Sequence, residues 1–341
     1  MTSEQWDKLL AVIDGELVEP MPVGFIIDSP WLANWAGISM LDYFSSEPKW
    51  FEANLKAIRE FPDVIFLPGF WSEFGMCTEP SAFGAKCSWQ ENAMPFAGEI
   101  ITDISQISNL AKANPQTDGL APFVLNRLKH YAGQIEQAGH AIKFAVARGP
   151  LNIACFLMNS TDFLIAIRTD PEPIHRLLGI VTDFLIDWLK LQAKTFSSID
   201  GVLILDDIVG FLGDDDFKAT ALPYLERIFQ SLDVAVRFFH NDAGGVVCAP
   251  YLEQMGVNLF NFSYKHPLGE MKELTNNAVT LLGNIPTLEV LAAGTPREVR
   301  ESVRAALEGV ADRSRIILSC GGGMPDGVSS ENIDAFVSAV G

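Results

Sequence analysis

The chain has 341 residues, of which 48% are hydrophobic and 20% charged, and its formal net charge is −19 at pH 7. These proportions suit a large globular core, whereas the acidic balance argues against nucleic acid or an anionic membrane as partner, because both need a basic surface. The five cysteines are scattered and include no Cys-x-x-Cys pair, which favours a reducing compartment over a disulfide framework.

At the N-terminus, residues 1–20 mix acidic with apolar side chains and lack both a basic start and a long apolar run. We therefore expect no secretory signal. No apolar run reaches the roughly 18 residues that a membrane-spanning helix needs, because Asp206 and Asp207 interrupt the stretch GVLILDDIVGFLG. These features predict a cytoplasmic protein that contacts no membrane.

Short apolar runs recur along the chain, and helical patterns separate them. The predicted strands are residues 23–27, 64–66, 142–147, 201–205, 235–239, 258–261, 280–282 and 315–318. The predicted helices are residues 49–60, 123–138, 171–195, 217–232, 247–255, 296–308 and 329–340. Thr295-Pro296 and Ser329-Ser330 are good starts for the last two helices.

This alternation predicts an α/β fold with a parallel sheet. Eight strands fit a single (β/α)8 barrel of residues 1–341, with a helix-rich insertion between strands two and three. An open doubly wound sheet is the alternative. Against it, the first strand is followed by IIDSPWLANW, where a glycine-rich phosphate loop would be expected.

Polar residues end most of the predicted strands. In a barrel, catalytic groups sit at the C-terminal ends of strands and on the loops after them. These polar ends include Asp28, Asp206, Asp207, His240, Asp242, Asn261, Asn284 and Cys320. We expect them to form a reaction cup in which Asp28, Asn261 and Asn284 contact the substrate. Glu79, in an excursion after strand two, is a fourth substrate contact or else a solvated loop acid.

Three of these residues offer the ligand types that zinc accepts. His240, Asp242 and Cys320 would supply nitrogen, oxygen and sulfur, and a catalytic zinc uses three such ligands and keeps one position open. The alternatives are a histidine hydrogen-bonded by a neighbouring carboxylate and a small buried cysteine. Asp206 and Asp207 are candidate catalytic acids or bases, although they could equally bind substrate or cap the next segment.

Several segments resemble the uroporphyrinogen decarboxylase superfamily. They are GPLNIACFLMNSTDFLIAIRTDPEPIHRLLGIVTDFLIDW, IDGVLILDD, LPYLERIFQSL, FHNDAGG, LLGNIPTLEVLAAGTPREV and ILSCGGGMPDGVSSENIDAFV, in this order. The resemblance runs from about Pro22 to the C-terminus and implies a (β/α)8 barrel. Uroporphyrinogen decarboxylases hold the substrate carboxylates with an arginine-rich segment similar to MRQAGRY. Here GFIIDSPWLANWAG stands in its place and has no arginine, so we expect no activity on porphyrinogens.

The resemblance points instead to the methyltransferase branch of that superfamily. Those enzymes bind zinc through a His-x-Cys…Cys pattern at the ends of strands five and eight. This chain has His240 and Cys320 at matching positions, but Asp242 replaces the first cysteine, a hard donor for a soft one. The chain has no D-x-H-x-x-G segment for binding a corrinoid. The resemblance therefore implies that a separate corrinoid protein supplies the cobalamin.

The function implied is a zinc-dependent transfer of a methyl group between that cobalamin and a small methyl donor or thiol acceptor. Two alternatives remain open. One is a metal-free decarboxylase or lyase acting on a non-porphyrin substrate, with Asp28, Asp206 or Asp207 as the acid. The other is a binding protein that keeps the barrel without catalysis.

Overall fold

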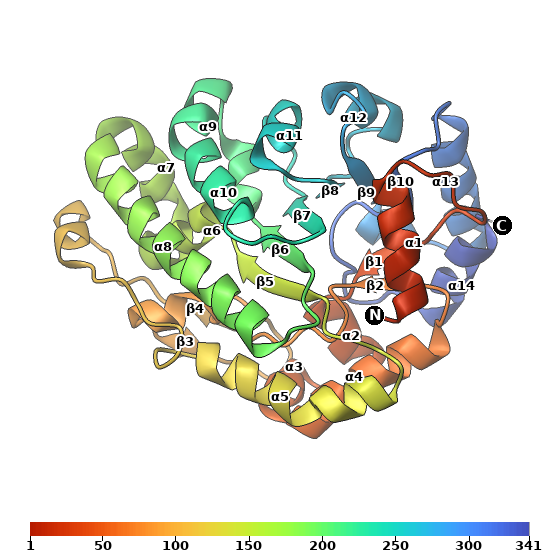
Figure 1. Ribbon diagram of the computed structural model, residues 1–341, viewed down its shortest axis with the longest axis horizontal. Coiled ribbons are helices and arrows are strands. Elements are labelled where there is room, and N and C mark those ends of the chain that lie inside the picture. Colours follow the sequence, from red (N-terminus) through yellow and green to blue (C-terminus); the bar gives the residue numbers. More distant parts are fainter. Residues whose placement is uncertain (341) are drawn as a thin grey trace.

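Eight parallel strands occupy the centre of the computed structural model, which describes residues 1–340, and helices surround them (Figure 1). The strands are β1 (Gly24–Ile26), β2 (Ile65–Leu67), β5 (Phe144–Arg148), β6 (Gly201–Leu205), β7 (Val236–Asn241), β8 (Leu259–Phe262), β9 (Thr280–Ile285) and β10 (Ile316–Cys320). Each coincides with a run predicted from the sequence, and the bounds differ by at most three residues.

The strands follow one another around the barrel in chain order. Strands β5 to β10 form one parallel sheet, and β1 pairs with β2. A bridge between Val23 and Leu318 joins β1 to β10, and the Leu318 N–H donates to the Pro22 carbonyl. Within residues 1–340, no ladder joins β2 to β5. The predicted (β/α)8 barrel is confirmed, whereas its treatment as one domain over 1–341 stays a prediction.

Most predicted helices are present, but two of them are broken. Intact ones are α4 (Glu47–Glu60), α5 (Ala121–Gln137), α8 (Pro171–Thr195), α13 (Pro296–Glu308) and α14 (Ser330–Ser338). The helix predicted over 217–232 is α9 (Asp214–Thr220) and α10 (Leu222–Phe229), because Pro223 starts a new helix. The one predicted over 247–255 is a 3₁₀ turn, η4 (Ala249–Tyr251), followed by α11 (Leu252–Met255).

Further helices lie outside the ranges predicted above. They are α1 (Ser3–Ile13), α2 (Ser29–Trp35), α3 (Met40–Ser45), α6 (Pro150–Met158), α7 (Ser160–Thr169) and α12 (Leu268–Leu274). The segment between the second and third barrel strands holds α5, the 3₁₀ helices η1 (Pro80–Phe83) and η2 (Ile104–Asn109), and the hairpin β3 (Cys87–Ser88)–β4 (Phe96–Ala97). No single helix among residues 1–340 is long and apolar enough to cross a membrane. Only α6 and α7 taken together, with a bend of 108° between them, have the length and composition of such a segment.

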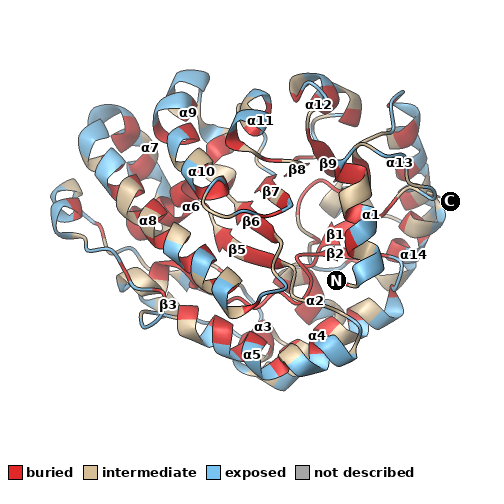
Figure 2. Ribbon diagram, in the orientation of Figure 1, coloured by how far each residue is buried: buried red, intermediate tan, exposed pale blue. Residues whose placement is uncertain are grey.

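Two apolar cores hold the barrel together. The larger lies between the strands and the outer helices, whose outward faces are exposed (Figure 2). The smaller fills the barrel interior and includes Leu203, Phe238 and Leu282 together with Trp6 and Leu9 of α1. Inside and outside of the strands are therefore both apolar, as expected of a parallel sheet, and polar groups are left to the strand ends.

Candidate metal centre at the barrel mouth

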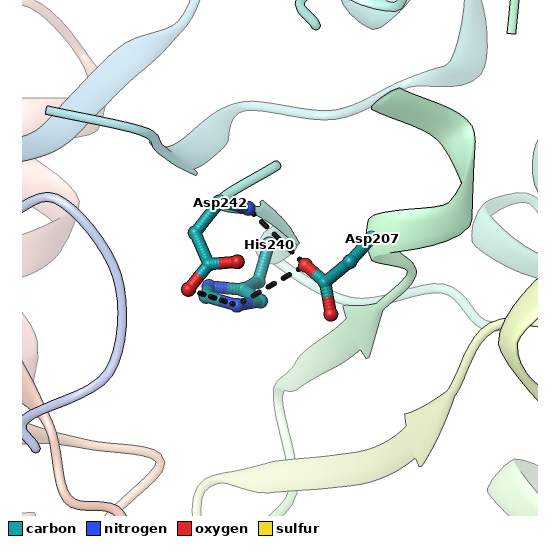
Figure 3. A group of neighbouring side chains, drawn as sticks. All are labelled: Asp207, His240 and Asp242. Atoms are coloured by element: carbon teal, nitrogen blue, oxygen red, sulfur yellow. Dashed lines mark hydrogen bonds and ion pairs between the residues drawn. The ribbon is translucent and has the colours of Figure 1, made fainter. Parts of the chain in front are cut away.

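Three side chains converge where β6 and β7 end. Asp207 begins the 3₁₀ helix η3 (Asp207–Phe211), His240 is in β7, and Asp242 follows that strand. One ligand atom from each lies within 4.8 Å of the others. The Nε2 atom of His240 is 3.5 Å from Asp207 Oδ1 and 3.8 Å from Asp242 Oδ2 (Figure 3). We call these three residues the His240 cluster.

A backbone N–H holds the Asp207 carboxylate, and a glycine leaves space for that of Asp242. The backbone N–H of Asp242 donates to Asp207 Oδ1 at 3.2 Å, which ties the loops after β6 and β7 together. Gly322, in the loop after β10, has a φ of +139°, and an added Cβ there would lie 2.7 Å from Asp242 Oδ2. A glycine is therefore needed at position 322 both for the backbone conformation and for space beside the Asp242 carboxylate.

The cluster is built to hold a positive charge. Burial alone would lower the pKa of His240, but the charges of Asp207, Asp242 and Asp28 and the hydrogen bond to Asn261 together outweigh it, so that the pKa is raised. Burial also raises the pKa of Asp242, and His240 opposes that shift. Both shifts mean that the cluster retains protons that ordinary histidine and aspartate side chains would lose.

The spacing of these donor atoms suits a small divalent cation. A tetrahedral zinc with bonds of about 2.0–2.2 Å has its ligand atoms about 3.3–3.6 Å apart. The separations of 3.5 and 3.8 Å around His240 Nε2 are close to that range. The Asp207 and Asp242 side chains are 38% and 42% exposed, so solvent or a substrate can reach the cluster. One nitrogen and two oxygens thus offer three ligand atoms to a cation and leave one side open.

Cys320 is not a member of this cluster. It ends β10 and is fully buried, and its thiol donates to the Gly322 carbonyl at 3.3 Å. Burial raises the pKa of this thiol to about 12. The metal-ligating role expected for Cys320 therefore stays a prediction, while Asp207, expected to be an acid or base, lies where a third ligand would be.

Asn261 is placed behind His240. Its Oδ1 lies 2.8 Å from His240 Nδ1, and its Nδ2 donates to the backbone carbonyls of Leu282 and Cys320. Asn284, also expected to contact the substrate, donates to the backbone carbonyl of His266. Both amides are thus engaged with protein groups, and their proposed contacts with substrate remain untested.

Asp206 has a different environment from its neighbour. It is fully buried, and its two carboxylate oxygens accept the backbone N–H groups of Leu151 (2.9 Å) and Asn152 (3.1 Å) at the start of α6. Burial raises its pKa well above the ordinary value. Asp206 therefore caps α6, which precedes it in the chain, and not the following segment η3, to which its side chain makes no capping hydrogen bond. These contacts give no support to the catalytic role.

A second group of charged side chains joins the end of β5 to the segment that follows β2. The Arg148 guanidinium is 2.9 Å from Glu73 Oε2 and 3.7 Å from Glu79 Oε2. The Glu79 carboxylate also accepts the Arg148 backbone N–H, so Glu79 is not a solvated loop acid. Sequence reasoning did not select Glu73 or Arg148, because their contact joins residues that are 75 positions apart.

Asp28 lies close enough to both groups to interact with their charges. Burial and the nearby Glu73 raise the pKa of Asp28 to about 7, although Arg148 and the Ser29 N–H oppose the rise. Its carboxyl group also interacts with the charge of His240. The mouth therefore carries five acidic side chains, and its buried arginine is already paired with two of them.

Comparisons with known proteins agree on one family. The family model for uroporphyrinogen decarboxylase (URO-D) matches residues 4–341. Uroporphyrinogen decarboxylase of Xylella fastidiosa is 23% identical, over 98% of this chain and 97% of its own. The methylated-thiol–coenzyme M methyltransferase of Methanosarcina mazei is 22% identical, over 78% of this chain and 70% of its own. A solved methyltransferase from Methanosarcina mazei has a TM-score of 0.82 at 19% identity, with 98% of both chains covered, which shows a shared fold.

Proposed function

Because the chain belongs to the uroporphyrinogen decarboxylase family, we propose that it is a metal-dependent methyltransferase of that family. It moves a methyl group between a small methylated substrate or thiol and the cobalamin of a separate corrinoid protein. The observation that carries this proposal is the convergence of Asp207, His240 and Asp242 at the barrel mouth. The similarity to a relative named for transfer from methylated thiols adds support.

The charges at the mouth favour methyl transfer over porphyrinogen decarboxylation. Residues 24–37 contain no arginine, and the nearby Arg148 is paired with Glu73 and Glu79. A tetrapyrrole with many carboxylates would find no free guanidinium there and would face the partly exposed carboxylates of Asp207 and Asp242. The same acids attract a divalent cation.

The chain's own residues divide the chemistry between them. His240 supplies a nitrogen ligand, and Asp207 and Asp242 supply oxygen ligands, with Cys320 as a candidate fourth. Zinc bound there would act as a Lewis acid that polarises a substrate heteroatom or favours a thiolate. Asp28, whose pKa of about 7 lets it carry a proton near neutrality, would protonate a leaving oxygen, nitrogen or sulfur.

Spectroscopy of free cobalamin tests this function. Zinc-loaded protein should convert methylcobalamin to cob(I)alamin with a thiol acceptor, or the reverse with a methylated donor. His240→Ala should abolish either reaction, because it removes the nitrogen ligand. Cobalamin that stays unchanged with thiols, thioethers, methyl ethers and methylamines would refute the proposal. It would leave the two alternatives, a metal-free decarboxylase or lyase with Asp28, Asp206 or Asp207 as the acid and a binding protein without catalysis.

A further inference from the structure

Asn261 is an amide buried among four neighbouring strands. It lies in β8, where His240 of β7 is its register partner, and it is fully buried. Its side chain also reaches the backbone of Leu282 in β9 and of Cys320 in β10. A buried amide costs free energy unless its polar atoms are paired, so these contacts fix its orientation.

The contacts of Asn261 leave one arrangement of its amide. Its Nδ2 lies 2.7 Å from the Leu282 carbonyl oxygen and 3.2 Å from the Cys320 carbonyl oxygen. Carbonyl oxygens only accept, so the NH₂ group must be at this end. The amide oxygen then faces His240 Nδ1 at 2.8 Å, and because it too only accepts, Nδ1 must carry the hydrogen.

We propose that Asn261 is a positioning residue that sets the tautomer of His240 and so keeps Nε2 free to bind a cation. A neutral imidazole has one N–H, and when Nδ1 carries it the lone pair is on Nε2. That lone pair faces Asp207 and Asp242, at 3.5 and 3.8 Å. The binding of a cation at Nε2 rests on the proposed function, whereas the tautomer of His240 does not depend on any metal.

The two carboxylates alone would favour the opposite tautomer. An Nε2–H group could donate to Asp207 or Asp242, and this charge-assisted hydrogen bond would withdraw Nε2 from a metal. Asn261 competes with that preference by offering only an acceptor to Nδ1. Hydrogen bonds of this kind, behind a metal-binding histidine, fix the ring and its tautomer in known metal sites.

Nitrogen NMR of metal-free protein with ¹⁵N-labelled histidine tests the tautomer directly. At alkaline pH, where the ring is neutral, wild-type His240 should show the Nδ1–H form. Asn261→Leu removes the acceptor, so the Nε2–H form should become the major one. Asn261→Asp keeps an acceptor and should keep Nδ1–H. Asn332→Leu is the matched control, because the buried Asn332 also donates to two backbone carbonyls, those of Leu291 and Gly294.

Zinc titration measures the consequence. Asn261→Leu should weaken zinc binding about 10–100-fold, the usual effect of losing a partner behind a metal ligand, and Asn332→Leu should not. An Nε2–H form in the wild type, or an unchanged Nδ1–H form in Asn261→Leu, would overturn the inference. The wild-type spectrum tests the Nδ1–H form of His240 even if a variant fails to fold. If the tautomers behave as expected but no form binds zinc, Asn261 still sets the tautomer of His240, and the proposed function fails.

Discussion

At the scale of single residues, the adjacent acids Asp206 and Asp207 have opposite environments. Asp206 is fully buried and accepts two backbone N–H groups of α6, whereas Asp207 is partly exposed and faces His240. Strand alternation stops where η3 begins, at Asp207, so the sequence alone does not tell which acid faces the mouth. The sequence makes both acids catalytic candidates. In the structure, Asp206 caps α6 and Asp207 belongs to the His240 cluster.

Replacing Asp206 tests its capping role. Asp206→Ala leaves the N–H groups of Leu151 and Asn152 without their acceptors, so the free energy of unfolding should fall by about 1–3 kcal/mol. Zinc stoichiometry should stay unchanged, since Asp206 is outside the His240 cluster. Urea denaturation and metal analysis measure the two effects. Loss of activity without loss of stability would instead make Asp206 a catalytic acid.

Asp28 should make stability depend on pH. Its pKa rises from an ordinary 3.8 to about 7, so the folded state binds the proton more tightly than the unfolded state. Stability should therefore fall as pH rises from about 4 through about 7, by up to about 4 kcal/mol from this group. Asparagine does not titrate, so the stability of Asp28→Asn relative to the wild type should be greater at pH 8 than at pH 4. Equal changes at both pH values would contradict the shift.

At the scale of elements, close contact between two loops sets the geometry of the cluster. Gly210, in η3, lies against Gly245, in the loop after β7, and an added Cβ at Gly245 would meet the Gly210 carbonyl oxygen. The 3₁₀ helix η3 carries Asp207, and the loop after β7 carries Asp242. If η3 moves away from that loop, the distances from His240 Nε2 to the two carboxylates change.

A single methyl group tests this arrangement. Gly245→Ala should push η3 away and weaken zinc binding by at least about tenfold, the scale of changes in groups that orient ligands. Gly213→Ala is the matched control, since no atom lies within 4 Å of a Cβ added there. Calorimetric zinc titration of both variants measures the difference. Equal affinities would show that the loop contact does not position Asp207.

The elements themselves were largely predictable, and their side-chain contacts were not. Each of the eight barrel strands was found because its apolar run is short and buried on both faces, whereas the short hairpin β3–β4 was not predicted. His240 and Asp242 were grouped because they lie two positions apart at one strand end. Glu73 and Arg148 were missed, since only the fold brings them together, and Asn261 was assigned to substrate because sequence does not show the partners of a buried amide.

At the scale of the whole molecule, the charge distribution argues against the substrate after which the family is named. The net charge is −19, and residues 24–37 have no arginine. We therefore expect no turnover of uroporphyrinogen, because its carboxylates would meet a negative field without a guanidinium to bind them. Chromatographic assay of the porphyrin products measures this. Coproporphyrinogen above the level of a no-enzyme control would contradict the expectation.

Zinc content tests the central claim, that the His240 cluster is a metal site. Protein purified without chelator, then supplied with zinc and desalted, should hold close to one Zn²⁺ per chain by elemental analysis. His240→Ala should lose it, and Asp207→Ala and Asp242→Ala should weaken binding by more than the roughly 10–100-fold typical of groups behind the ligands. Cys320→Ser shows whether the thiol belongs to the ligand set; we expect a milder loss, since it lies outside the cluster. A wild-type content near zero after added zinc would contradict the account.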